Sequence, residues 1–251
     1  MTHVNSLVDI VIVNYNTKNL LLTCLESIHK HTKESHHIYI IDNGSTDGSV
    51  ERLARMGRDH LDVISNPRNT GYAVACNQGI RAGQSPFILL LNSDVIVTRN
   101  WLTPLLDCMV TDSRIAVVGP KMVNQKGLIT GAGIVGTFQN HAPRGFMEAD
   151  GPGKYETVED CFSVCGAAYL IRRSLLDTLG LFDENYFFYF EETDYSLNAR
   201  YQGYRVVYCP NSKIIHLTGQ SNKNHEQLRT YFETSEHYFR TKWSHLTSSE
   251  I

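Results

Sequence analysis

The sequence predicts an α/β protein with a mostly parallel, doubly wound sheet. Short apolar runs alternate with longer segments of helical periodicity through the N-terminal part of the chain. This alternation is typical of strands joined by crossover helices, which make neighbouring strands run parallel. The chain has 251 residues, a length that suits one large α/β domain or two small ones. It can bury a sizeable core without disulfide bonds.

The N-terminal elements follow from hydrophobic periodicity. Residues 8–13 form a mostly apolar run, typical of a buried strand. Residues 19–31 instead place apolar side chains three and four positions apart, as one face of a helix requires. The same criteria predict strands at 38–41, 61–65 and 87–91. They also predict two helices: one is capped by Ser45 or Thr46 and continues through Met56, and the other spans 72–82.

The pattern changes in the C-terminal part of the chain. The expected elements are a helix at 101–110, a strand at 115–119, a long loop at 136–160, ordered structure at 162–172, helices at 174–179 and 191–202, separate strands at 204–208 and 213–216, and a helix at 224–243. Gly203 is the expected stop of the 191–202 helix. Aromatic residues lie roughly on one side of the last helix. Packing against the rest of the protein is the preferred explanation for them, with contact to a membrane surface as the alternative.

Composition excludes several classes of function. The chain is 42% hydrophobic and 20% charged, as in ordinary globular proteins, and its net charge of −3 gives no sign of a nucleic-acid-binding surface. Its six cysteines lack the second close pair that would complete a zinc site, so reduced thiols are expected. The sequence shows neither a signal peptide nor an apolar run of about 20 residues, so we expect a cytoplasmic protein.

Polar residues gather where the predicted parallel strands end. They are Asn14-Tyr15-Asn16, Asp42, the segment 66–69, and Asn92-Ser93-Asp94. Open α/β sheets bind ligands along this edge. Each cluster alone could be an ordinary turn, because asparagine, aspartate and glycine favour turns. Four clusters on one predicted edge indicate a binding site.

Asn92-Ser93-Asp94 is a candidate cation site. It directly follows the apolar run 87–91. One carboxylate can hold Mg²⁺ or Mn²⁺ while substrate phosphates and water fill the other positions. His216 ends a short apolar strand, and its imidazole could complete the site if the fold brings it to Asp94.

A second acidic element comprises Glu191, Glu192 and Asp194, directly after the aromatic run 186–190. Charges beside apolar surface cost free energy unless a cation, a proton or a substrate uses them. Favourable placement at a helix N-terminus, worth about 0.3–1 kcal/mol per charge, could explain one or two of the three. We expect one of them to face a cleft as a general base.

Two common nucleotide-binding motifs are excluded. Residues 131–136 match the G-x-G-x-x-G dinucleotide pattern, but that motif needs a buried strand before it and a helix after it. Here polar residues precede it, and a segment with proline and glycine follows. The sequence contains no G-x-x-x-x-G-K-[ST] loop, which argues against P-loop phosphoryl transfer.

Together these residues resemble the family 2 glycosyltransferases, a large group of inverting enzymes with the GT-A fold. The resemblance extends from about Val8 to Gln220, and the chain looks most like the bacterial rhamnosyltransferases of that family. The similar segments, in the family's order, are Asn14-Tyr15-Asn16, Asp42-Asn43-Gly44-Ser45-Thr46-Asp47, Asn69-Thr70-Gly71-Tyr72 with Asn77, Asn92-Ser93-Asp94, Cys165-Gly166-Ala167, Gly180-Leu181-Phe182-Asp183-Glu184 and Phe190-Glu191-Glu192-Thr193-Asp194.

The resemblance implies a role for each site residue. Asp42 would hydrogen-bond the pyrimidine base of a nucleotide-sugar, with Tyr15 near that base. Asp94 would bind the divalent cation, Mg²⁺ or Mn²⁺, on the diphosphate. Glu192 would be the catalytic base, with Asp194 and Glu191 as the alternatives. The remaining donor-binding residues would be Asn14, Asn69, Gly71, Asn92 and Ser93, and His216 would be a further metal ligand.

Two positions depart from the family's pattern. Asn92 replaces the first aspartate of the D-x-D motif, and an amide is a poorer metal ligand. Asp94 would therefore carry the cation nearly alone. Glu192 stands where aspartate is more common, and its extra methylene still lets the carboxylate reach a substrate.

The resemblance also implies how the chain is organised. Residues 1–251 would form a single GT-A domain, with a nucleotide-sugar-binding half at about 8–95, an acceptor and catalytic half at about 96–220, and a C-terminal helix in 221–251. The activity would be inverting transfer from TDP-rhamnose or a UDP-hexose to a hydroxyl of a glycan or lipid-linked glycan, in bacterial polysaccharide assembly. The protein would be cytoplasmic, with peripheral contact at the inner face of the membrane as an option.

Two other functions stay open from the sequence. A sugar-phosphate nucleotidyltransferase also uses an α/β nucleotide fold. It usually carries a glycine-rich, basic loop after the first strand, and this loop is absent here. A non-catalytic protein that binds nucleotide-sugars is the third hypothesis, and intact carboxylates at both acidic elements argue against it.

Overall fold

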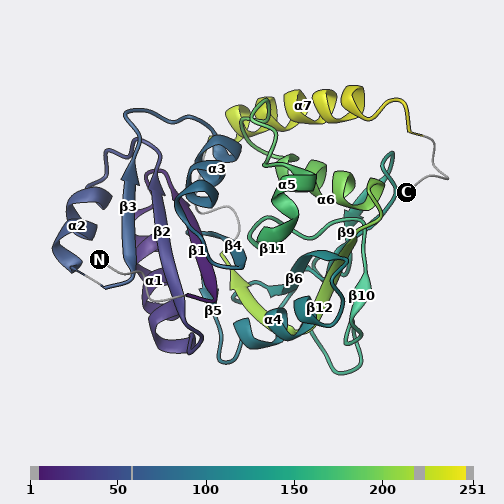
Figure 1. The fold of residues 1–251 in the computed structure, drawn as a ribbon, viewed down its shortest axis with the longest axis horizontal. Helices are drawn as coiled ribbons and strands as arrows, with labels where there is room; N and C mark the ends of the chain where they lie inside the picture. Colours follow the sequence, from purple (N-terminus) through teal and green to yellow (C-terminus); the bar gives the residue numbers. More distant parts are fainter. Residues whose placement is uncertain (1–5, 58, 218–223, 247–251) are drawn as a thin grey trace.

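One large mixed sheet organises the computed structural model, which describes residues 6–57, 59–217 and 224–246 (Figure 1). Ten strands of the described chain belong to it, in the order β10-β12-β6-β11-β4-β1-β2-β3, with β5 paired to β12 and β7 to β6. The strands are β1 (Val8–Asn14), β2 (His36–Asp42), β3 (Leu61–Ser65), β4 (Phe87–Asn92), β5 (Val95–Val97), β6 (Ile115–Val123), β7 (Ile129–Gly131), β10 (Glu159–Asp160), β11 (Ala168–Arg172) and β12 (Arg205–His216). A separate hairpin pairs β8 (Ile134–Gly136) with β9 (His141–Pro143).

The sheet is mostly parallel, as the sequence predicts. The strands β3, β2, β1 and β4 run parallel to one another, and β12 runs parallel to β6. Between β4 and β6 lies β11, which is antiparallel to both. The sheet therefore continues without a break from the N-terminal strands to the C-terminal ones.

Helices cover both faces of this sheet, which makes the fold doubly wound. They are α1 (Lys18–His31), α2 (Ser49–Met56), α3 (Tyr72–Ala82), α4 (Leu102–Val110), α5 (Leu176–Leu179), α6 (Glu191–Tyr201) and α7 (His225–Lys242). Side chains of β1 alternate between the faces: Ile10 and Ile12 join a core with α1 and α4, whereas Val11 joins a core with α3, α6 and α7. Each fully buried side chain of this kind contributes about 1.5–3 kcal/mol.

Several predicted elements differ in detail from the structure. The two strands expected at 204–208 and 213–216 are one strand, β12, because a register shift between Cys209 and Lys213 absorbs the intervening residues. The segment 136–160, predicted to be a long loop, contains the short strands β9 and β10. The helix α2 begins after Gly48 rather than at Ser45 or Thr46, and a 3₁₀ turn (Arg173–Leu175) precedes α5.

The C-terminal helix α7 packs across the face that carries α6 (Figure 1). Its residues Phe232 and Phe239 lie 5.3 Å and 5.2 Å from the ring of Phe190, measured between ring centroids. The packing expected for the aromatic residues of this helix is therefore observed. Among the described helices, none is long and apolar enough to cross a membrane.

A tight backbone contact joins the start of α3 to the segment before α6. The amide of Tyr72 donates to the carbonyl of Phe187 at 2.7 Å. Gly71 has φ of +91°, and a Cβ there would lie 2.9 Å from the same carbonyl oxygen. Tyr189 and Phe190 also have positive φ, 72° and 70°. Such conformations cost free energy and persist only where the surroundings impose them.

Replacing Gly71 with alanine should therefore destabilise the protein by about 2–4 kcal/mol, because it adds a steric clash to an unfavourable φ. Gly153→Ala is the matched control, since Gly153 has φ of +79° with no atom within 4 Å of its Cβ position. Urea unfolding of both variants measures the difference. Equal losses in the two variants would show that the contact with Phe187 is not tight.

Candidate functional site

A cavity of about 250 Å³ lies at the carboxyl ends of β1 and β4. Six of the predicted site residues line it: Tyr15, Asn69, Gly71, Asn92, Ser93 and Asp94. Other lining residues were not predicted as site residues, among them Thr17, Tyr72, Phe187, Phe188, Gln227 and Tyr231. The wall thus combines the polar strand edge with aromatic side chains from α3, α7 and the segment before α6.

Behind the cavity, a chain of hydrogen bonds crosses the ends of three strands. The amide of Asn14 donates to the Asp42 carboxylate at 2.7 Å and accepts from the Thr17 hydroxyl at 2.7 Å. The hydroxyls of Thr17 and Ser93 are 2.9 Å apart. Asn14 and Asp42 are fully buried, 0% and 1% exposed, and neither is among the residues that line the cavity. Their hydrogen bonds therefore join the strand ends behind the residues that line the cavity.

A second asparagine shapes the loop between β3 and α3. The Oδ1 atom of Asn43 accepts from both the amide and the hydroxyl of Thr70. Its Nδ2 atom donates to Asn69 Oδ1 at 2.9 Å and to the Gly71 carbonyl at 3.1 Å. This buried carboxamide therefore fixes the loop that carries Asn69 and Gly71 to the cavity.

The fold brings His216 to Asp94. Pairing of β5 with β12 places His216 opposite Val95, and the Leu217 amide donates to the Asp94 carbonyl at 2.9 Å. His216 Nε2 and Asp94 Oδ1 are 3.3 Å apart, and both side chains are largely buried. A carboxylate with an imidazole is a donor set that suits Mn²⁺ or Mg²⁺ when phosphates and water supply the other positions. Within the described ranges, no group of three or more His, Cys, Asp or Glu side chains could hold a metal.

Asn92 has a partner that the sequence did not reveal. The hydroxyl of Tyr72 donates to Asn92 Oδ1 at 2.8 Å, and its next acceptor, the Gly166 carbonyl, is 3.4 Å away. Burial raises the pKa of Tyr72 well above its ordinary value, with smaller contributions from Cys76 and the charge of Glu192. The phenol therefore stays protonated and acts as a donor.

The three acidic residues of α6 have different surroundings, and Asp194 is the most strongly bound. Its carboxylate accepts from Trp243 Nε1 at 2.7 Å, from Lys242 Nζ at 2.8 Å and from the Tyr186 hydroxyl at 3.1 Å. Lys242 also donates to Asp183 at 2.7 Å. Asp194 therefore anchors the end of α7 to the body of the protein.

Glu191 is buried without a full set of partners. Its side chain is in a residue only 4% exposed, and Oε2 has no hydrogen-bond partner among the described residues. Burial, and then the charge of Glu192, raise its pKa well above the ordinary value. The surroundings of Glu191 thus favour its uncharged form.

Glu192 is half-buried and lies beside Gly166. A Cβ atom at Gly166 would be only 3.2 Å from the Glu192 Cδ, so glycine makes room for this carboxylate. Burial raises its pKa, and hydrogen bonds from backbone amides, including that of Gly166, partly oppose the shift. The pKa of Cys165 is raised to about 12 by burial and then by the charges of Glu192 and Asp94. Both carboxylates are therefore near this one thiol, and Gly166 connects Glu192 to Tyr72 at the cavity.

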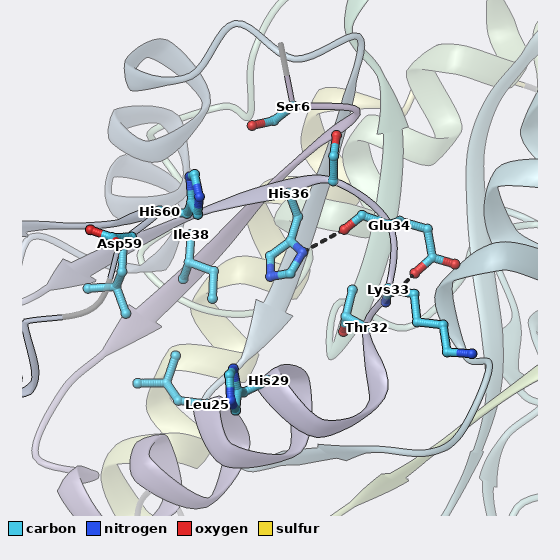
Figure 2. Close-up of a pocket in the computed structure, with 12 residues that line it drawn as sticks. Ser6, Leu25, His29, Thr32, Lys33, Glu34, His36, Ile38, Asp59 and His60 are labelled. Carbon is cyan, nitrogen blue, oxygen red and sulfur yellow. Dashed lines mark hydrogen bonds between the residues drawn. The ribbon is translucent and has the colours of Figure 1, made fainter. Parts of the chain in front are cut away.

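A larger hollow, about 540 Å³, lies elsewhere, between α1 and the first residues of β2 and β3. Figure 2 shows its histidines, His29, His36 and His60, which come from three different segments. His36 Nδ1 is 2.8 Å from the Glu34 carbonyl. This hollow is at the amino end of the strands, whereas α/β sheets bind ligands at the carboxyl end. The smaller cavity is the candidate site.

Comparisons with known proteins identify the family of this chain. Residues 9–180 match the model of the family described as Glycosyl transferase family 2. One relative, the N-acetylglucosaminyl-diphospho-decaprenol L-rhamnosyltransferase of Mycobacterium tuberculosis, is 26% identical over 82% of this chain and 75% of its own length. Another, the O-antigen biosynthesis protein RfbC of Myxococcus xanthus, is 25% identical over 86% of this chain, which spans only 18% of that protein.

Solved structures share the fold at low sequence identity. GalNAc-T7 with UDP, GalNAc and Mn²⁺ superposes with a TM-score of 0.69 at 18% identity, covering 86% of this chain and 44% of that one. The mannosyltransferase PcManGT of Pyrobaculum calidifontis, with GDP-Man and Mn²⁺, gives 0.65 at 16% identity, covering 91% and 61%. These neighbours are GT-A glycosyltransferases, so the expected GT-A fold is confirmed. The family match covers most of the chain, and the protein belongs to glycosyl transferase family 2.

Proposed function

We propose that this protein transfers a sugar from a nucleoside-diphosphate donor to an acceptor hydroxyl, with inversion at the anomeric carbon. The observation that carries the proposal is the Asp94–His216 pair, in which Asp94 lines the cavity at the carboxyl edge of the sheet and His216 contacts Asp94 from β12. Family membership and two solved neighbours that contain Mn²⁺ with UDP or GDP-Man support it. In this proposal residues 8–95 bind the donor, and residues 96–220 supply the base and the acceptor side.

The residues divide the chemistry between them. Asp94 and His216 would hold Mg²⁺ or Mn²⁺, which when bound would neutralise charge on the leaving diphosphate. Glu192 accepts the proton of the acceptor hydroxyl while the oxygen of that hydroxyl bonds to the anomeric carbon. The bond from that carbon to the diphosphate breaks in the same step. General base catalysis typically contributes 10²–10⁴-fold. Tyr15, Asn69 and Gly71 line the donor cavity.

Glu192 is the preferred base because, among the described residues, no cationic side chain pairs with its carboxylate. Asp194 is committed to Lys242 and Trp243, and burial favours the uncharged form of Glu191. Glu192 is the most exposed of the three acids. Because the mycobacterial relative is an L-rhamnosyltransferase that acts on N-acetylglucosaminyl-diphospho-decaprenol, TDP-rhamnose is the first donor to test and a lipid-linked glycan the first acceptor. Such an acceptor would place the protein at the inner face of a membrane.

A panel of UDP-, TDP- and GDP-sugars, with and without Mn²⁺ or Mg²⁺, tests the proposed donor site. We expect one nucleotide class to raise the melting temperature in a metal-dependent way, with slow release of its diphosphate. Stabilisation without any hydrolysis or transfer would indicate a non-catalytic binding protein. No stabilisation by any member would contradict the donor site itself.

Replacing Glu192 with glutamine should lower kcat by at least about 100-fold and leave donor affinity unchanged, because only the base is removed. Glu191→Gln is the matched control: burial favours the uncharged form of this carboxyl, which an amide imitates, so most activity should remain. Transfer rates and donor titrations separate the effects. An active Glu192→Gln enzyme beside an inactive Glu191→Gln enzyme would reverse the assignment.

Asp194→Asn should act on stability rather than on chemistry. It removes the carboxylate that pairs with Lys242 and accepts from Trp243, so the free energy of unfolding should fall by about 1–3 kcal/mol. Urea unfolding measures this loss. The kcat of the folded fraction should stay within a few-fold of the wild type, and a 100-fold drop would make Asp194 the base instead.

The pH profile of kcat follows from the raised pKa of Glu192. A base must be deprotonated, so activity is full above its pKa and is lost as the pH falls through it. Because burial raises this pKa above the ordinary value of 4.5, the acid limb should lie above pH 4.5. Measured kcat against pH in the wild type and in Glu191→Gln should give the same limb. A limb below pH 4.5 would contradict a buried base.

A further inference from the structure

The Asn92 carboxamide is held in one orientation. A carboxamide has an accepting oxygen at one end and a donating NH₂ at the other, and hydrogen-bond partners decide which way it turns. Here the Tyr72 hydroxyl donates to Oδ1 at 2.8 Å. Asn92 is also fixed at its backbone, where its amide donates to the Ala167 carbonyl at 3.0 Å. Turning the amide by 180° would make Nδ2 donate to the phenol oxygen and leave the phenol proton to the Gly166 carbonyl, which is 3.4 Å away and forms a weaker hydrogen bond.

The amide nitrogen is the end that remains for a ligand. Among the described residues, none accepts a hydrogen bond from Asn92 Nδ2, whereas both Asn92 and Tyr72 line the cavity. Asp94, two residues along, lines the same cavity and carries the negative charge of this turn. The turn thus presents one carboxylate and one pair of N–H donors to the same space.

We propose that Tyr72 is a positioning residue that turns the NH₂ group of Asn92 toward the bound donor, where it donates a hydrogen bond to a phosphate oxygen. This inference rests on the proposed donor site. N–H groups that point at an anion stabilise it partly as a cation does, because both offset the same negative charge. The protein therefore binds a nucleoside diphosphate measurably without metal, and the metal improves that affinity less than it would with an aspartate at position 92.

The orientation gives Tyr72 a role that can be separated from packing. Without the phenol hydroxyl, the Asn92 amide can turn by 180° and present its oxygen, which repels phosphate and attracts a cation. An aspartate at position 92 has two equivalent oxygens, so it has no orientation for Tyr72 to set. The hydroxyl of Tyr72 should therefore matter when residue 92 is asparagine and should not matter when it is aspartate.

Calorimetric titration of TDP and UDP, in EDTA and in Mn²⁺, tests this with wild type, Tyr72→Phe, Asn92→Asp and the double variant. The measured quantity is the metal enhancement, the ratio of Kd in EDTA to Kd in Mn²⁺. Asn92→Asp should weaken binding in EDTA by about tenfold or more, because a negative charge replaces a donor. Its metal enhancement should rise by a similar factor.

Tyr72→Phe should raise the metal enhancement of the wild type about threefold or more and leave that of Asn92→Asp unchanged. Tyr201→Phe is the control for loss of a phenol, since Tyr201 is 53% exposed on α6 and lies outside the cavity. It should bind as the wild type does.

These titrations distinguish a failure of the proposed donor site from a failure of the role proposed for Tyr72. A wild type that binds neither nucleotide, with or without Mn²⁺, would overturn the donor site and the inference with it. A wild type that binds, with Asn92→Asp binding equally well in EDTA, would overturn the inference alone. An equal effect of Tyr72→Phe in both backgrounds would also overturn it, because it would show a role in packing and not in orienting an amide.

Discussion

A buried chain of hydrogen bonds from Asp42 through Asn14 and Thr17 to Ser93 holds the functional edge of the sheet together. It joins the carboxyl ends of β2, β1 and β4, which hydrophobic packing alone would leave free to shift. Burying a polar group costs free energy unless the group is hydrogen-bonded. This chain of hydrogen bonds therefore forms only when the three strand ends are in register. Tyr15, Ser93 and Asp94 take their positions from that register.

The opposite wall of the cavity is fixed by a different kind of contact. Asp194 accepts hydrogen bonds from Lys242 and Trp243 and so secures α7, whose Gln227 and Tyr231 reach the cavity. The three acidic residues of α6 therefore have different roles. Asp194 anchors a helix, burial favours the uncharged form of Glu191, and Glu192 retains an available charge beside Gly166. Burial and partners divide these roles, since the residue types are nearly the same.

Local periodicity is what made much of the fold predictable. The strands β1 and β4 and the helices α1 and α3 have apolar patterns that need no distant partner. The strand β12 was predicted as two, and only its pairing with β6 shows that a register shift between Cys209 and Lys213 joins them. The site was predictable as a set of strand ends, and a meeting of His216 with Asp94 was predicted on the condition that the fold allows it. The Tyr72–Asn92 bond was not predicted, because it depends on how the fold places α3 relative to β4.

The central claim is that the carboxyl-edge cavity binds the donor through a cation on Asp94. A crystal structure of the protein soaked with TDP and Mn²⁺ tests it most directly, because anomalous scattering locates the metal independently of the nucleotide. We expect a manganese peak about 2.0–2.3 Å from the Asp94 carboxylate, with the diphosphate in the cavity beside Asn92. A peak at Glu191 and Glu192, or nucleotide bound in the histidine-lined hollow near α1, would contradict it.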